Sequence, residues 1–485
     1  MRALTLFCMV CSLLEIAFAQ PDTLWTQTFG GSLDDCGRSV QQTTDGGYII
    51  VGSTDSFGTG YNSDVYLIKT DGLGNERWSR TYGGDNSDYG YCVQQITDGG
   101  YIITGMTQIG GSYWGPDVYL VKTDVLGNEL WYRTFGGTDA DWGYSVQQTF
   151  DGGYIIVGHT ESFGAGNEDI YLIKTNYLGA EDWSHTFGGS GYDRGFSVQQ
   201  TADSGFVFTG EYYDYNFNRF YVRLIKVNRW GAEVWSRSFG GGFNQGGYCV
   251  QQTTDGGFIV AGYISPYSPG YQNIYLIKTD ESGDDLWSQV IGESSCDEGY
   301  SVQQTSDGGY IIAGSTVSNN NNNVYLVKTD GSGNELWSQM FGGSDHERGY
   351  SVQQTEDGGY IVAGVTTSLG AGNEDVYLIR VDSEGTIVEE PDPGNRVPLS
   401  CSYLSIAPNP FNPTTAISYQ LSAVSHVNLS VYDVSGRKVA TLVAGWRDAG
   451  SHEVTFDGSD LASGIYFCLM EVGEFVQTRK MVLMK

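Results

Sequence analysis

The chain has 485 residues and a formal net charge of −32, from 57 acidic and 25 basic side chains. A negative charge of this size repels phosphate backbones and excludes nucleic acid as an expected partner. With 69 glycines, 34 tyrosines and 40% hydrophobic residues, the composition is that of a folded, turn-rich β protein long enough for more than one domain.

The first 19 residues have the pattern of a secretory signal peptide. Arg2 supplies the positive start, Leu4 to Phe18 is mostly apolar, and Ala17-Phe18-Ala19 fits the cleavage pattern of small residues. We therefore expect export, with a mature chain that begins at Gln20. No other apolar run is long enough for a transmembrane helix, so none is expected.

Residues 20–383 consist of seven copies of one unit. A tryptophan marks each copy at intervals of 50 to 53 residues: Trp25, Trp78, Trp131, Trp183, Trp235, Trp287 and Trp337. Four β-type runs recur between turn residues: Ser-Val-Gln-Gln-Thr, Tyr-Ile-Ile-x-Gly, Val-Tyr-Leu-Ile-Lys and Leu-Trp-Ser-x-x-Phe. This pattern predicts a seven-bladed β-propeller with four strands per blade, the Ser-Val-Gln-Gln strand innermost and the Trp strand outermost.

The ends of the repeated units do not coincide with the ends of the predicted blades. The chain opens with a lone Trp strand, Trp25 to Phe29, and the last unit ends after Val376 to Val381 without a Trp strand of its own. We expect the N-terminal strand to complete the last blade and so close the ring without an open edge. The Asp-Gly-Gly turns predict tight hairpins, and the paired glutamines are expected to bond neighbouring backbone.

The rest of the chain differs in kind. Residues 384–400 form an acidic linker that contains proline, and residues 401–485 hold seven short apolar or alternating runs, which predict a β-sandwich. Six cysteines follow the signal peptide, mostly in loops or strands of non-adjacent units, so we expect mostly free thiols. If any pair forms, Cys401–Cys468 fits best.

The C-terminal domain resembles the sorting domain of the type IX secretion system and the related immunoglobulin-like domain of flagellar hook-capping proteins. The residues that carry this resemblance are Pro408-Asn409-Pro410-Phe411-Asn412-Pro413, Val431-Tyr432-Asp433, Gly436-Arg437, Ser463-Gly464-Ile465-Tyr466 and Lys480 to Lys485. The resemblance implies that bacterial outer-membrane export machinery reads residues 401–485, and that the protein is extracellular or on the outer cell surface. The propeller is similar to bacterial secreted repeat proteins with Trp-Ser-x-x-Phe-Gly-Gly and Asp-Gly-Gly-Tyr motifs.

One position of the repeat is acidic in six of seven units, six residues after the Phe of Phe-Gly-Gly or its equivalent. Its members are Asp35, Asp88, Asp141, Asp193, Gln245, Asp297 and Glu347. In a propeller these residues gather around the channel, where a carboxylate rim would hold Ca²⁺ or a cationic group. The alternative is that each side chain caps backbone N–H groups of its own loop.

The next position varies while its neighbours stay fixed. Tyr89, Trp142 and Arg194 occupy it in three consecutive units, which makes one side of the rim aromatic and basic. Aromatic faces beside carboxylates suit sugar rings, so these three residues are the candidate ligand site. The alternative is that these differences are ordinary sequence variation in a loop, with no role in binding.

No catalytic motif and no phosphate loop occurs, and none of the five histidines, His159 among them, has metal-ligand spacing with another. We therefore expect a secreted or surface-displayed propeller that binds a glycan or a protein without catalysis and without a cofactor other than Ca²⁺. Two alternatives stay open: a polysaccharide hydrolase or lyase that uses carboxylates such as Asp141 and Asp193, and a structural envelope protein.

Overall fold

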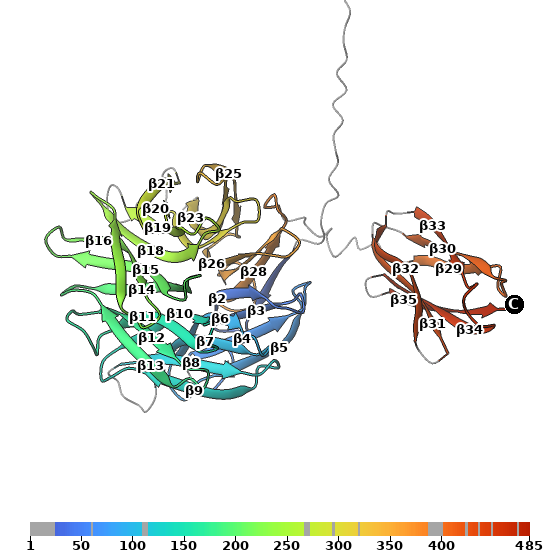
Figure 1. Ribbon diagram of the computed structural model, residues 1–485, viewed down its shortest axis with the longest axis horizontal. Coiled ribbons are helices and arrows are strands. Elements are labelled where there is room, and N and C mark those ends of the chain that lie inside the picture. The colour runs from blue at the N-terminus through green and yellow to red at the C-terminus, as the bar shows by residue number, and fades with distance from the viewer. Residues whose placement is uncertain are drawn as a thin grey trace, which may run out of the picture. The chain divides into compact units, whose positions relative to one another are not determined.

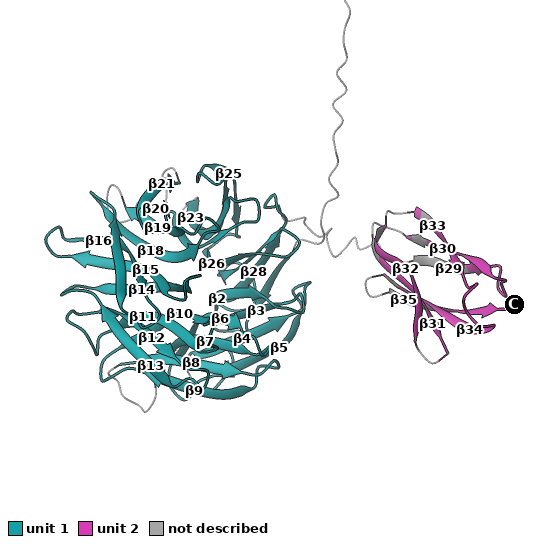
Figure 2. Ribbon diagram, viewed as in Figure 1, with its two compact units in different colours: residues 1–389 teal, residues 390–485 magenta. Residues whose placement is uncertain are grey.

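The computed structural model describes residues 25–59, 62–108, 115–265, 272–292, 296–318, 321–386, 401–421, 425–434, 437–447, 450–472 and 475–485. The chain forms two compact units, residues 1–389 and 390–485 (Figure 2). The predicted signal peptide and residues 387–400 of the predicted linker lie outside the described residues. No helix long and apolar enough to cross a membrane occurs in the part of the chain that is described.

The first unit consists of seven four-stranded antiparallel sheets arranged side by side (Figure 1). In order of pairing, the strands are β2–β5 in sheet 1 (Asp35–Gln42, Tyr48–Thr54, Asp64–Thr70, Glu76–Tyr82), β6–β9 in sheet 2 (Asp88–Gln95, Tyr101–Thr107, Asp117–Thr123, Glu129–Phe135), β10–β13 in sheet 3 (Asp141–Gln148, Tyr154–Thr160, Asp169–Thr175, Glu181–Phe187), β14–β17 in sheet 4 (Asp193–Gln200, Phe206–Asp214, Arg219–Val227, Glu233–Phe239), β18–β21 in sheet 5 (Asn244–Gln252, Phe258–Ser265, Asn273–Thr279, Asp285–Ile291), β22–β25 in sheet 6 (Glu298–Gln304, Tyr310–Ser318, Asn321–Thr329, Glu335–Phe341), and β26, β27, β28 and β1 in sheet 7 (Glu347–Gln354, Tyr360–Thr366, Asp375–Val381, Trp25–Phe29). The predicted all-β class is confirmed.

The first strand of each sheet lies innermost. A central cavity of about 250 Å³ is lined by the valine and the first glutamine of every Ser-Val-Gln-Gln run. The Trp strand is the opposite edge strand of each sheet, so the predicted strand order is confirmed. In sheet 7 that edge strand is β1, which pairs with β28 from Trp25↔Arg380 to Phe29↔Val376.

Hydrophobic cores lie between consecutive sheets. Between sheets 3 and 4, for example, Ile155 and Leu172 pack with Phe206 and Phe208, all of them at most 1% exposed. The repeated tryptophan packs against the tyrosine or phenylalanine that begins the second strand of the next sheet, as in the edge-on contact of Trp131 with Tyr154 at 6.0 Å. The repeated tryptophan therefore packs between sheets.

The paired glutamines tie each innermost strand to the next. The side-chain Oε1 of Gln41 accepts the backbone N–H of Gln95 at 2.6 Å, and the same bond recurs between every following pair of sheets. The seventh bond runs from the N–H of Gln42 in sheet 1 to Gln353 in sheet 7, also at 2.6 Å. The hydrogen bonds that the sequence predicts for these glutamines are therefore confirmed.

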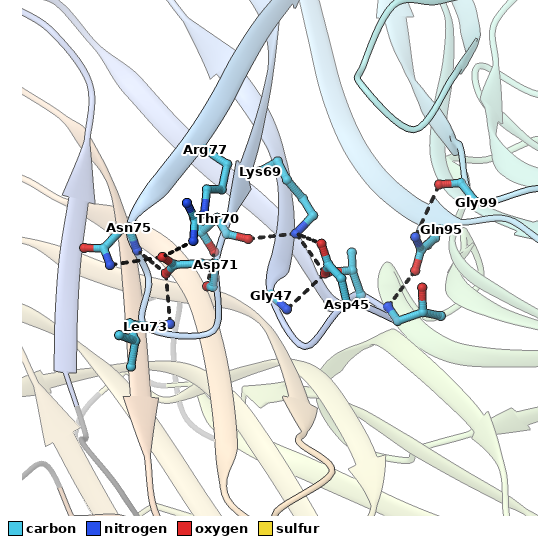
Figure 3. A network of polar contacts seen from close by, with 12 residues as sticks. Asp45, Gly47, Lys69, Thr70, Asp71, Leu73, Asn75, Arg77, Gln95 and Gly99 are labelled. Carbon is cyan, nitrogen blue, oxygen red and sulfur yellow. Dashed lines mark hydrogen bonds and ion pairs between the residues drawn. The ribbon is translucent and has the colours of Figure 1, made fainter. Parts of the chain in front are cut away.

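The hairpin that joins the first two strands of each sheet is bound to a basic residue from the third strand, a lysine in six sheets and Arg380 in sheet 7. Figure 3 shows the contact in sheet 1. In sheet 1 the Lys69 ammonium lies 3.0 Å from an Asp45 oxygen and donates to the Thr70 carbonyl at 2.7 Å. The Lys69 side chain is only 6% exposed, so these contacts replace its lost hydration. Burial acts to raise the pKa of Asp45, but hydrogen bonds from Thr43, Lys69 and the Gly47 N–H lower it to about 2.

These turns should make stability fall at low pH. The pKa values of Asp45, Asp203 and Asp307 are about 2 in the folded protein, below the ordinary carboxyl value of about 3.9. Their contribution is therefore complete above about pH 4 and is lost as the pH falls toward about 2. Urea unfolding between pH 5 and pH 2 measures this loss.

A triple variant, Asp45→Asn with Asp203→Asn and Asp307→Asn, should be less stable at pH 7 because three buried lysines lose their counter-charge. Its stability should also fall less between pH 4 and pH 2. Asp85→Asn, in an exposed loop, is the control and should follow the wild-type profile. An unchanged acid profile in the triple variant would contradict this account of the turns.

The second unit is a two-sheet β-sandwich. One sheet contains β29 (Cys401–Ala407), β30 (Thr414–Leu421) and β33 (Gly450–Asp457), and the other contains β32 (Lys438–Arg447), β31 (Ser425–Asp433), β34 (Gly464–Val472) and β35 (Phe475–Leu483). Phe411, Tyr419 and Met481 belong to its core. Cys468 is a free, fully buried thiol in that core, so the pair with Cys401 that would fit the sequence best does not form. Cys36, Cys92 and Cys249 are also free, as expected.

Candidate binding site at the mouth of the channel

A β-bulge in each innermost strand shapes the channel. In sheet 3 the register of β10 against β11 shifts between Gly143 and Ser145, and the other six sheets have the same shift. A bulge adds one residue on one strand and re-aims its side chain. The added residue follows the conserved glycine of the repeat, and we call these seven residues the ring positions: Arg38, Tyr91, Tyr144, Phe196, Tyr248, Tyr300 and Tyr350.

The ring positions contact one another in series around the channel. Successive aromatic centroids lie 5.2 to 5.4 Å apart from Tyr91 to Tyr350. The Arg38 guanidinium lies 4.2 Å above the Tyr350 ring. At the other end of the series, burial raises the pKa of Tyr91 and the charge of Arg38 opposes that shift. Six aromatic rings and one cation therefore surround the channel at one level.

The variable residue directly before each conserved glycine is among the first three residues of its innermost strand, at the end of the channel that we call its mouth. We call these residues the slot positions: Cys36, Tyr89, Trp142, Arg194, Gly246, Glu298 and Arg348. Each pairs with a residue near the end of the second strand, which we call its facing position: Ser53, Met106, His159, Glu211, Tyr263, Ser315 and Val365. Sequence differences between the units are therefore concentrated in paired positions around one opening.

The aromatic part of the mouth is centred on Trp142, which is half-buried. Its indole is stacked with His159, at 5.8 Å and 21°, and with Tyr91, at 6.0 Å and 19°. Tyr89 lies in the neighbouring slot, where its hydroxyl bonds Ser63 at 3.0 Å. Trp142 therefore belongs to an aromatic surface that continues into the ring, and its faces are already partly covered.

The charged part of the mouth is centred on Arg194. Its guanidinium forms a bidentate ion pair with Glu168, in which Nη2 lies 2.8 Å from Oε1. This bond to Glu168 is the main reason that the pKa of Arg194 is raised. Burial acts to raise the pKa of Glu168, but the Arg194 bond and the neighbouring charges hold it below its usual range.

Glu211 is a buried carboxyl group beside this pair. It fills the space next to Gly246, where any Cβ would collide with the Glu211 side chain. Burial raises its pKa to about 7, while Arg194 and a hydrogen bond from Tyr263 oppose the rise. Glu211 is thus a carboxyl that changes its charge near neutral pH, and strongly raised carboxyl pKa values are frequent at functional sites.

The repeat position that is acidic in six of the seven units is buried. Asp35, Asp88, Asp141, Asp193, Asp297 and Glu347 are each at most 1% exposed. Asp141 Oδ2 accepts the Gly137 N–H at 2.8 Å and the Ser162 hydroxyl at 2.7 Å. Asp35, Asp88, Asp193 and Glu347 bond the second glycine of their own loops in the same way. These contacts are the ones expected if each side chain caps backbone N–H groups of its own loop, which was the alternative to a carboxylate rim.

Sequence reasoning missed the ring positions, Glu168 and Glu211. The ring has a clear signal, because tyrosine or phenylalanine follows the conserved glycine in six of seven units. Glu211 occupies the same repeat position as His159, so its departure from the small or apolar residues of other units was also visible. Glu168 has no such signal, because it enters the site through the pairing of β11 with β12.

Comparison with known proteins supports the assignment of the C-terminal unit. Residues 405–484 match the family model of a secretion system C-terminal sorting domain. No curated protein matches the chain.

Several solved structures are similar at low identity. A surface component of the type IX secretion system of Porphyromonas gingivalis, PorZ, is 11% identical with a TM-score of 0.41, and the match covers 94% of this chain and 60% of PorZ. A fungal alcohol oxidase of the AA5 family is 11% identical with a TM-score of 0.44, covering 94% of this chain and 98% of that one. Sqt1 from Chaetomium thermophilum is 11% identical with a TM-score of 0.42, covering 70% and 83%.

Because these TM-scores are below 0.5, we infer nothing about the function of this chain from the three structures. The assignment depends on the family model and on the seven repeated sheets. The protein is a propeller-like, all-β protein that carries a type IX secretion sorting domain at residues 405–484 and is located at the cell surface or outside the cell.

Proposed function

We propose that the chain is a closed seven-bladed propeller that is displayed or released by the type IX machinery and binds a neutral glycan at the mouth of its channel. The signal peptide 1–19, the propeller 20–383, the linker 384–400 and the sorting domain 401–485 are the parts of this proposal. The export machinery is the partner of the sorting domain.

The observation that carries the proposal is the one-sided mouth. Tyr89, Trp142 and Arg194 lie in consecutive sheets next to a ring of six aromatic side chains, and Glu168 and Glu211 lie beside them. An apolar floor with a few fixed polar groups is typical of small-ligand sites, and aromatic rings suit the faces of sugars. The charge of −32 disfavours polyanionic glycans, which leaves neutral saccharides as the expected class.

The test is a glycan array with the full chain, combined with an assay for released sugar ends. We expect binding without release. Trp142→Ala should weaken binding about tenfold because it removes the aromatic wall of the site. Trp230→Ala is the matched control, since Trp230 is 62% exposed on a hairpin outside the mouth. Equal binding by wild type and Trp142→Ala would contradict the proposed site.

A polysaccharide hydrolase or lyase is the second candidate, and Glu211 is the observation that favours it. A carboxyl with a pKa of about 7 is suited to act as a general acid. Release of sugar ends that disappears in Glu211→Gln, with binding retained, would establish the enzyme and overturn the binding proposal. If neither glycan binding nor release of sugar ends is detected, the expected function becomes binding of a protein ligand or a structural role in the envelope.

A further inference from the structure

Three side chains with metal-ligating atoms meet at one corner of sheet 3. His159, Glu161 and Glu168 each place one such atom within 4.8 Å of the other two. The pairing of β11 with β12 explains why these three side chains lie close together. His159 lies in β11, and Glu161 follows Thr160, the last residue of that strand. Thr160 pairs with Asp169 of β12, which brings the following Glu161 next to the preceding Glu168.

His159 is buried with an unused hydrogen-bonding atom. Its side chain is 5% exposed, and Nδ1 has no hydrogen-bond partner. Leaving a buried nitrogen unpaired costs free energy, so such a group calls for a ligand. The imidazole packs against two aromatic rings, Trp142 at 5.8 Å and Tyr144 at 5.6 Å. Its position is therefore fixed before any ion arrives.

Glu168 is oriented in the same way. Two N–H groups of Arg194 fix its carboxylate, and the Glu168 side chain is 10% exposed. Each carboxylate oxygen has a second lone pair, so the arginine does not use up the ligating capacity of Glu168. Metal ligands are commonly fixed by such outer hydrogen bonds, which raise their affinity for the ion.

The set occurs once among the seven units. The three equivalent residues in the other units are Ser53, Asp55 and Ser63; Met106, Gln108 and Pro116; Glu211, Tyr213 and Phe220; Tyr263, Ser265 and Gln272; Ser315, Val317 and Asn322; Val365, Thr367 and Glu374. None of these sets contains a histidine, and none contains three ligating side chains of the imidazole or carboxylate type. The site in sheet 3 is therefore a local addition to the repeat.

We propose that His159, Glu161 and Glu168 bind one Zn²⁺ ion. One imidazole and two carboxylates form a mixed nitrogen and oxygen set, which suits Zn²⁺ and disfavours Ca²⁺, whose ligands are oxygens. Three protein ligands leave a fourth position for water or for an oxygen of a bound molecule. The proposal goes beyond glycan binding and does not depend on it.

The test is a titration of the full chain, first stripped of metal with a chelator. Calorimetry with Zn²⁺ should find one equivalent, and Co²⁺ in its place should give the visible absorption of a low-symmetry site. His159→Ala and Glu161→Gln should each weaken Zn²⁺ binding at least tenfold. His185→Ala is the matched control, because His185 is an exposed histidine on β13 of the same sheet, and it should bind like wild type.

Glu161 is exposed, so Glu161→Gln should fold normally and decides the question if His159→Ala does not fold. Absence of Zn²⁺ binding in the wild type would overturn the proposal. Wild-type affinity in Glu161→Gln would also overturn it, as would binding of Ca²⁺ but not of Zn²⁺. Because the readouts are metal binding and absorption, failure of the glycan proposal leaves this result unaffected.

Discussion

Replacing Gly158 by alanine is expected to lower the free energy of unfolding by about 3 kcal/mol, because the new methyl group has no space. A Cβ at Gly158 would overlap the carbonyl oxygen of Trp142, which the bulge of β10 brings over the second strand. The same clash would occur in the other units, which explains the glycine of every Tyr-Ile-Ile-x-Gly run and of its variants. Urea unfolding monitored by tryptophan fluorescence measures the loss.

The variant should also displace Trp142 and with it the aromatic side of the mouth. Ligand binding should therefore fall together with stability. Gly84→Ala is the control, since a Cβ there meets nothing within 4 Å and the backbone needs no positive φ. Stability of Gly158→Ala equal to that of Gly84→Ala would show that the backbone relaxes without cost and would contradict the role given to the bulge.

Deleting residues 25–29 should have the largest effect, a loss of more than about 5 kcal/mol. The deletion removes Trp25 and Phe29, both 9% exposed, from the core between sheets 7 and 1. Each large buried aromatic side chain contributes about 3 kcal/mol or more. It also leaves β28 as an unpaired edge strand, which is a site for association with other chains.

The measurements are the thermal unfolding midpoint and the molar mass by light scattering. We expect a lower midpoint and association into larger species. Addition of a peptide with the sequence of residues 25–29 should partly restore the monomer. Gln27→Ala, a half-buried residue within the same strand, is the control and should stay near wild type. A monomer with an unchanged midpoint after the deletion would show that β1 is dispensable.

Much of the fold follows from the period of the repeat. The order of the four strands, the pairing of Trp25 to Phe29 with the last sheet and the bonds of the paired glutamines are all consequences of one unit copied seven times. Errors in one unit are averaged over the others, which makes such predictions robust. The Cys401–Cys468 pair lies outside the repeat and had no such support.

The candidate site was harder to predict because it depends on contacts between strands. The sequence singled out Trp142 and Arg194 as departures from the repeat, and both lie at the mouth of the channel. It did not indicate that a bulge follows the conserved glycine, and so it missed the ring that begins at Tyr91. The sequence also did not predict that Glu168 lies beside His159, because that contact depends on the register between β11 and β12.

The glycine at the end of each second strand has a consequence for how this surface diversifies. It fits against the backbone carbonyl of a slot position, such as that of Trp142, and not against the side chain. The frame therefore constrains the main chain and leaves the side chains at the slot and facing positions open to exchange, apart from Gly246, where Glu211 and Tyr263 already fill the space. Such a separation of constant framework and variable contact residues is the principle of antibody recognition. Paralogues of this chain, or a designed library, could thus acquire new specificities by substitution alone.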